Sequence, residues 1–150
     1  MKLRFTVLGE PQGKGRPIFS TFGGRVSART PEKTVEYENL IKAVYRRANP
    51  DRKFSDEAML DLRVVSFYGI PASASNRRRM AMLAGEVRPT KRPDADNILK
   101  VVADSLNGVA YRDDAQIVDT QIRKFYSSQP RIEIIIQEVG GISHEQMQFS

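Results

Sequence analysis

Hydrophobic side chains recur along the chain at two different spacings, and these spacings limit the secondary structure that the chain can form. Residues 2–8 and 59–68 alternate apolar and polar side chains, the pattern of a half-buried strand, and 117–126 and 131–138 are two further predicted strands. Residues 31–48 and 96–107 instead repeat apolar side chains at intervals of three and four, the pattern of an amphipathic helix. The sequence therefore predicts strands and helices in one chain.

The order of these segments, with a short helix predicted at 74–84, is β-α-β-α-α-β-β. This order favours a single α+β domain with a mixed or antiparallel sheet of about four strands and helices packed on it. Residues 9–29 are rich in glycine and predict a long loop with a short hairpin around 19–26. The Ser-Ser-Gln-Pro connection at 127–130 predicts that the last two strands form a hairpin. The domain is placed at 1–139, followed by a loose tail at 140–150.

Residues that favour helix ends stand where the helices should begin and stop. Thr30 is the predicted cap of the first long helix, with Pro31 at its first position. Asp96 is the better cap for the second, which Asn107-Gly108 ends. The short helix has three candidate end residues: Ser73 or Ser75 at its start and Gly85 at its stop. The expected buried stripes are Tyr37, Leu40, Ile41, Val44, Tyr45 and Ala48, and Ile98, Leu99, Val102, Ala103 and Leu106.

The residue types present exclude several kinds of chemistry. The chain has no cysteine, which excludes disulfide bonds, thiolate catalysis and cysteine zinc sites. Its single histidine, His144, is predicted to be an idle residue of the tail, so one chain cannot supply a histidine cluster for a metal. The sequence has neither an apolar run of membrane-spanning length nor the apolar core of a signal peptide. We therefore expect a cytoplasmic protein without membrane contact.

Charge is distributed unevenly along a chain whose net charge is +6. Residues 1–30 carry six Lys or Arg and one Glu, and residues 71–92 carry six Lys or Arg and one Glu. Residues 94–120 carry six Asp against one Lys and one Arg. A basic flank draws the phosphate backbone, whereas an acidic centre draws divalent cations. The sequence therefore predicts a metal-dependent enzyme that acts on nucleic acid.

The acidic candidates stand at the start of the second long helix and before the third predicted strand. Asp94 and Asp96 are two residues apart in the segment that leads into this helix. In an extended segment, side chains two residues apart point to the same side. Asp113-Asp114 is the obvious distant supplier of another carboxylate. Such hard oxygen ligands suit Mg²⁺. The alternative is that the first two cap the helix and the Asp pair forms a turn, as these residues commonly do.

A compound motif goes beyond this spacing: Arg92-Pro-Asp-Ala-Asp-Asn-Ile-Leu-Lys100, then Asp104-Ser-Leu-Asn-Gly108, then Tyr111-Arg-Asp-Asp-Ala-Gln-Ile117. It closely resembles the RusA family of Holliday-junction resolvases, whose pattern is Asp-x-Asp-Asn, a lysine one turn later, and Asp-Asp-x-Gln-Ile/Val. The basic loop Gly13–Pro17 is similar to that family's N-terminal loop.

The resemblance implies that Asp94, Asp96 and Asp114 are the catalytic carboxylates and hold one or two Mg²⁺ ions, with Mn²⁺ as a substitute. It implies that Lys100 is the catalytic lysine, and Asn97 matches the motif's asparagine. For Lys100 the alternative is an ion pair with Asp96 or Asp104 on the same helix. Some members of the family have a basic residue directly before the first Asp. This chain has Pro93 at that position, and Arg92 would serve in place of the basic residue.

The surface that holds DNA is expected to surround these residues. Its candidates are Lys14, Arg16, Arg77, Arg78, Arg79, Lys91, Arg92 and Asn97, with Arg25 and Arg29 in the glycine-rich loop. For each, a merely solvated charge is the alternative. Most aromatic side chains are expected in the core, and Phe19 and Phe22 are the exceptions that suit base stacking.

The function implied is a homodimeric, Mg²⁺-dependent endonuclease, bacterial or phage-derived, that resolves four-way DNA junctions by paired symmetric nicks in recombination and repair. Two alternatives stay open. One is a less selective nuclease of branched DNA with the same site. The other is a non-catalytic DNA-binding module whose carboxylates only cap a helix.

Overall fold

The computed structural model describes residues 1–143 and 147, and the expectation for His144 lies outside them. Within the described residues the chain forms six strands, three α-helices and one 3₁₀ helix. The strands are β1 (Lys2–Leu8), β2 (Ile18–Phe22), β3 (Arg25–Arg29), β4 (Leu60–Gly69), β5 (Ile117–Ser127) and β6 (Arg131–Glu138). The helices are α1 (Glu32–Ala48), α2 (Asn76–Leu83), α3 (Ala95–Ser105) and the 3₁₀ helix η1 (Asp114–Gln116).

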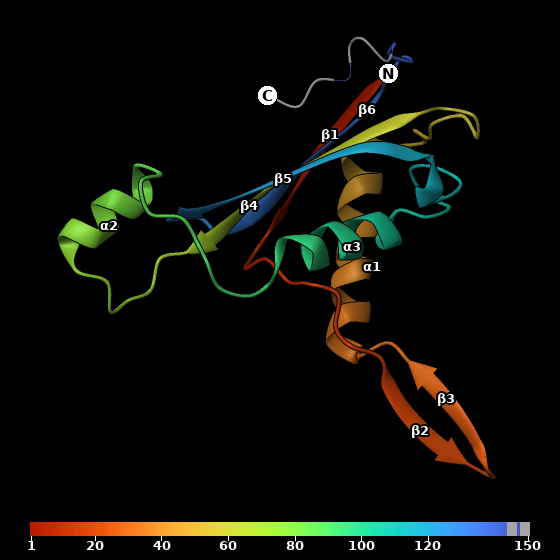
Figure 1. Ribbon diagram of the computed structural model, residues 1–150, viewed down its shortest axis with the longest axis horizontal. Helices are drawn as coiled ribbons and strands as arrows, with labels where there is room; N and C mark the ends of the chain where they lie inside the picture. The colour runs from red at the N-terminus through yellow and green to blue at the C-terminus, as the bar shows by residue number, and fades with distance from the viewer. Residues whose placement is uncertain (144–146, 148–150) are drawn as a thin grey trace.

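The main sheet of the described chain has the strand order β1-β6-β4-β5. β6 pairs antiparallel with both β1 and β4, whereas β5 pairs parallel with β4, so the sheet is mixed. Helices α1 and α3 lie on one face of it (Figure 1). The predicted α+β fold is therefore confirmed, in its mixed form.

The predicted hairpin between the last two strands is wrong, because β4 lies between β5 and β6. The short connection passes the end of β4 instead of making a tight turn between paired strands. β6 lies between β1 and β4 and fully buries Ile132, Ile134 and Ile136, whereas β5 lies at the edge of the sheet, where Val118 is 55% exposed.

The core lies between the main sheet and the two helices. Leu3, Phe5 and Val7 face inward from β1, as their alternation predicts. Two details of α1 differ from expectation. Its N-cap residue is Pro31 and not Thr30. Its buried stripe includes Thr34, whereas Leu40, which is 43% exposed, and Ala48 are not buried as predicted. The stripe is narrower than the apolar pattern suggests, because only the face toward the sheet and α3 is covered.

The short helix α2 lies beyond the end of the main sheet (Figure 1), where it contacts β5. Of its two candidate caps, Ser75 is the one used, since its hydroxyl accepts a hydrogen bond of 3.2 Å from the Arg78 backbone N–H. Gly85 follows the helix with a φ of +79°, a conformation that glycine adopts without strain.

Strands β2 and β3 form a separate two-stranded ribbon. It is longer than the hairpin predicted around 19–26, and every residue in it is exposed. The ribbon projects from the body next to the start of α1 (Figure 1).

Candidate functional site

The start of α3 carries the first two candidate carboxylates. The N-cap residue is Asp94, with the extended backbone expected there, and Asp96 lies inside the first turn. The prediction that Asp96 is the cap is therefore wrong. In the described chain the Asp94 side chain makes no capping hydrogen bond either. Capping thus occupies neither carboxylate, and both stay exposed to solvent.

The turn before β5 separates the roles of the Asp pair. Asp113 caps η1, because its carboxylate accepts a hydrogen bond of 3.0 Å from the Ala115 backbone N–H. The Gln116 side chain completes the capping box and donates to the carbonyl oxygens of Ser55 and Ala58 at 2.9 and 3.1 Å. The alternative of turn formation therefore holds for Asp113, and capping does not use the Asp114 carboxylate.

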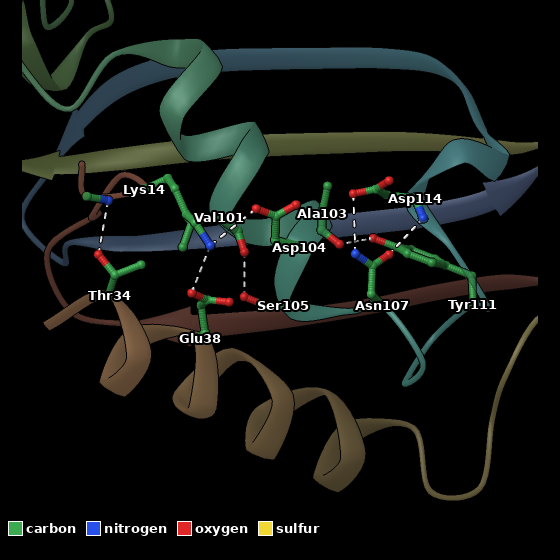
Figure 2. A network of polar contacts seen from close by, with 11 residues as sticks. Lys14, Thr34, Glu38, Val101, Ala103, Asp104, Ser105, Asn107, Tyr111 and Asp114 are labelled. Atoms are coloured by element: carbon green, nitrogen blue, oxygen red, sulfur yellow. Dashed lines mark hydrogen bonds and ion pairs between the residues drawn. The ribbon is translucent and has the colours of Figure 1, made fainter. Parts of the chain in front are cut away.

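Asp114 is fastened to the end of α3 by Asn107. The Asp114 backbone N–H donates to Asn107 Oδ1 at 2.7 Å, and Asn107 Nδ2 donates to Asp114 Oδ2 at 3.4 Å (Figure 2). The Tyr111 hydroxyl also ties this loop to α3, since it donates to the Ala103 carbonyl at 2.6 Å. Asn107 is a positioning residue that the sequence pattern did not reveal, because Asn-Gly indicates only a helix end.

The structure brings Asp96, Lys100 and Asp114 together around one depression on the surface. Its other lining residues are Leu62, Leu99, Ala103, Ile117 and Thr120. Asp94 lies in a neighbouring depression, which also contains Arg16, Arg92 and Asn97. Among the described residues, no three acidic or histidine side chains are grouped closely enough to hold one metal ion. Two of the three predicted carboxylates therefore share a depression, and the third, Asp94, lines a separate one.

Electrostatics distinguish Asp114 from its neighbour. Partial burial raises the pKa of the Asp114 carboxyl, and nearby Asp113 and Asp104 raise it further, whereas the hydrogen bond from Asn107 lowers it. The hydrogen bond from Ala115 lowers the pKa of Asp113, which is fully exposed. Burial raises the pKa of the Tyr111 hydroxyl, and the nearby Asp114 carboxylate raises it further. A cation at this depression would relieve the repulsion among these carboxylates, and their hard oxygen donors suit Mg²⁺.

Lys100 projects from α3 into the same depression and is exposed. Among the described residues, its ammonium forms no ion pair within 4.0 Å, so the alternative pairing with Asp96 or Asp104 is not formed. Asp104 is instead paired with Lys14 at 3.3 Å. The Lys100 ammonium is therefore available to a phosphate group.

Lys14, a predicted DNA contact, is bound within the protein (Figure 2). Its ammonium lies 3.1 Å from Glu38 Oε1 of α1 and 3.3 Å from Asp104 Oδ2 of α3. Burial alone would lower the pKa of Lys14, but the two carboxylates more than offset this and raise it. The Lys14 backbone N–H also donates to the Asn97 carbonyl at 3.1 Å. In this arrangement the side chain joins two helices, and contact with phosphate stays a prediction.

The glycines on either side of Lys14 are required by packing. A Cβ atom on Gly13 would lie 2.9 Å from Asn97 Cβ, and one on Gly15 would lie 2.6 Å from Thr34 Oγ1. Both distances are too short for real contacts. The Gly-Lys-Gly sequence thus lets the N-terminal loop run tightly between α1 and the start of α3.

Two residues that the sequence pattern placed only in strands hold the segment before Asp94. The Tyr68 hydroxyl donates to the Pro93 carbonyl at 2.5 Å, and Lys124 Nζ donates to the Lys91 carbonyl at 2.8 Å. Burial raises the pKa of Tyr68 to about 12, so its hydroxyl stays protonated and keeps donating at neutral pH. Burial lowers the pKa of Lys124, and Asp94 acts in the opposite direction. Both side chains position the approach to α3.

Apart from Lys14 and the ribbon residues Arg25 and Arg29, the predicted basic residues fall into two groups. Arg16 and Arg92 line the depression that contains Asp94, together with Asn97. Arg78 and Lys91 line another one beside Tyr126. The remaining two members, Arg77 and Arg79, lie with Arg78 on α2, at a distance from α3 (Figure 1). Contact of either group with DNA stays a prediction.

An α+β domain that groups two carboxylates with a lysine that has no ion pair in the described chain, beside a depression lined by arginines, has the features of an enzyme that cleaves phosphodiester bonds in nucleic acid. The sequence model of a family described as "Endodeoxyribonuclease RusA" matches residues 9–137. The chain belongs to this family of endodeoxyribonucleases, which confirms the resemblance seen in the motif.

Two relatives are similar to the chain over most of its length. "Uncharacterized protein YqaN" of Bacillus subtilis (strain 168) is 38% identical over 139 residues, which cover 91% of this chain and 96% of the relative. "Crossover junction endodeoxyribonuclease rusA" of Lactococcus phage r1t is 33% identical over 100 residues, which cover 66% of this chain and 70% of the relative. Within the described part of the chain, no helix has both the length and the apolar character needed to cross a membrane.

Proposed function

We propose that this protein is a Mg²⁺-dependent endonuclease that resolves four-way DNA junctions by paired symmetric nicks in recombination and repair. The observation that carries the proposal is the depression shared by Asp96, Asp114 and Lys100, in a chain that belongs to the RusA family. The phage relative, whose name describes a crossover junction endodeoxyribonuclease, supports the choice of junctions as substrate.

Asp96 and Asp114 are the proposed ligands of Mg²⁺, with Mn²⁺ as a substitute. Mg²⁺ is commonly held in proteins by one or two carboxylates together with water and substrate phosphates, so a two-carboxylate depression suits it. When bound, such an ion makes water more acidic and neutralises charge on a leaving oxygen. Asp94 stands at the same helix start but is not grouped closely enough with the other two carboxylates to share their ion, so it is the proposed ligand of a second ion.

The chain's own cations complete the proposed site. Lys100 donates to the scissile phosphate and stabilises the negative charge that develops there, because its ammonium is unpaired in the described chain. Arg92 and Arg16 hold the adjacent backbone from the depression next to it. Asn107 positions Asp114, and Tyr68 positions the segment that leads to Asp94.

A homodimer is part of the proposal. A four-way junction has to be nicked on two strands of like polarity, and a two-fold symmetric dimer supplies two related sites. Paired nicks at symmetric positions are the expected product.

The proposal is tested with five labelled DNA substrates: an immobile four-way junction, a flap, a fork, a duplex and a single strand. Each is incubated with Mg²⁺, Mn²⁺ or EDTA. Paired symmetric nicks on the junction alone, with either metal and not with EDTA, are the expected result. Equal cutting of flaps and forks would indicate a less selective nuclease. Binding without cutting under every metal condition would indicate a non-catalytic module.

A further inference from the structure

The β2–β3 ribbon is an isolated structural element in the described chain. All ten of its strand residues are exposed, and it extends away from the body (Figure 1). Its turn is well formed, because Gly23 and Gly24 have φ values of +59° and +77°, as a tight two-residue hairpin turn requires. A single two-stranded ribbon is only marginally stable in water. The ribbon therefore suits contact with a partner.

The pairing of the two strands gives the ribbon two different faces. Residues directly opposite each other share a face, and Phe22 pairs with Arg25, Ser20 with Ser27 and Ile18 with Arg29. The 2.9 Å contact between the hydroxyls of Ser20 and Ser27 agrees with this assignment. We call this side the cationic face. The opposite, mainly apolar face carries Phe19, Thr21, Val26 and Ala28.

Charge indicates which partner fits the cationic face. Residues 11–31 contain four Lys or Arg and no Asp or Glu. Among the described residues, neither Arg25 nor Arg29 forms an ion pair within 4.0 Å. Arg16 stands two residues before the ribbon and lines the depression that contains Arg92 and Asp94. The ribbon thus begins close to the depression that contains Asp94, and the charge of its cationic face is complementary to a polyanion.

We propose that the ribbon is a DNA-binding arm whose cationic face contacts the phosphate backbone of a duplex arm next to the cleavage site. This inference rests on the proposed function, which makes DNA the substrate. Strands of five residues extend over about 16 Å, and a two-stranded ribbon fits the major groove of B-form DNA, which is about 12 Å wide. Phe22 lies at the tip of the same face and is 90% exposed, so its ring can stack on an unpaired base at a branch point.

The test compares Arg25→Ala/Arg29→Ala with Arg46→Ala/Arg47→Ala. The second pair removes the same charge from exposed positions at the opposite end of α1. Binding of a fluorescent four-way junction and of a duplex is measured by anisotropy in EDTA, over a series of salt concentrations. Each lost phosphate contact lowers the slope of log K against log salt by about 0.9. The ribbon variant should lose about 1.8 in slope, and its affinity should fall about 60-fold at 0.1 M salt but only about 10-fold at 0.3 M. The Arg46→Ala/Arg47→Ala control should change the slope and the affinity much less than the ribbon variant does.

A second variant, Phe22→Ser, should weaken binding to the junction more than binding to the duplex. Unchanged slope and affinity in the arginine variant would overturn the arm while leaving the nuclease proposal intact. Dissociation of a dimer by the arginine variant, measured by light scattering, would also overturn it, because the ribbon would then bind a second copy. A wild-type protein that binds no DNA would overturn the proposed function and the arm together.

Discussion

Replacing Lys14 by methionine tests whether this side chain holds the N-terminal loop to both helices. Methionine keeps the aliphatic length but removes the ammonium that lies 3.1 Å from Glu38 and 3.3 Å from Asp104. The three side chains are 21%, 16% and 29% exposed, so the two carboxylates would lose their partner in a largely enclosed place. A hydrogen bond to a charged group contributes roughly 1.5–3 kcal/mol, and solvent screening reduces the sum for these part-exposed groups. We expect the free energy of unfolding to fall by about 2 kcal/mol.

The measurement is urea denaturation followed by circular dichroism, with thermal unfolding as a second readout. For a chain of 150 residues, about 2 kcal/mol corresponds to a midpoint lowered by about 4–8 °C. The matched control is Lys100→Met, which removes an exposed ammonium without an ion pair in the described part of the chain and should change stability by less than about 0.5 kcal/mol. If the two variants unfold at the same urea concentration, the proposed role of Lys14 is refuted.

The stability difference between wild type and Lys14→Met should depend on pH, in a direction that the raised pKa of Lys14 determines. The carboxylates raise the pKa of Lys14 in the folded protein above its ordinary value of 10.5. The stabilisation is therefore fully present below pH 10.5 and is lost as the pH rises through the folded-state pKa. The stability difference between wild type and Lys14→Met should accordingly shrink at alkaline pH.

Three further changes probe the candidate site and the loop beside it. Asp96→Asn and Asp114→Asn should each lower the rate of junction cleavage at least about 100-fold, because each removes a proposed metal ligand. Junction binding should stay intact or become tighter, because each change also removes a negative charge near phosphate. Asp119→Asn, outside the depression, is the control in cleavage and binding assays. Asn107→Ala should lower the cleavage rate about tenfold, because Asp114 loses its two hydrogen bonds, and an equal loss of rate and binding would argue against a positioning role. Gly15→Ala should lower the free energy of unfolding by about 1–3 kcal/mol, since its Cβ would lie 2.6 Å from a threonine hydroxyl of α1; an unchanged urea midpoint would contradict this.

Much of the candidate site could be predicted from the sequence because its motif is local. Asp94, Asp96 and Lys100 fall within seven residues of one helix start, where the backbone fixes their spacing. The position of Asp114 could not be predicted in this way. Its place depends on Asn107 and on the contact of α3 with the turn before β5.

The sequence by itself determined the helices, the strands and their approximate ends, because apolar period, caps and glycine stops act between neighbouring residues. It also determined the family, through the motif from Arg92 to Ile117. Only the tertiary structure decided that β4 separates β5 from β6, since strand order depends on which apolar faces are buried across the whole sheet. It also decided that Lys14 pairs with Glu38 and Asp104, while Lys100 has no ion pair with any residue that the structure describes. Both lysines carry the same charge, and only the helices packed around them distinguish a structural cation from a candidate catalytic one.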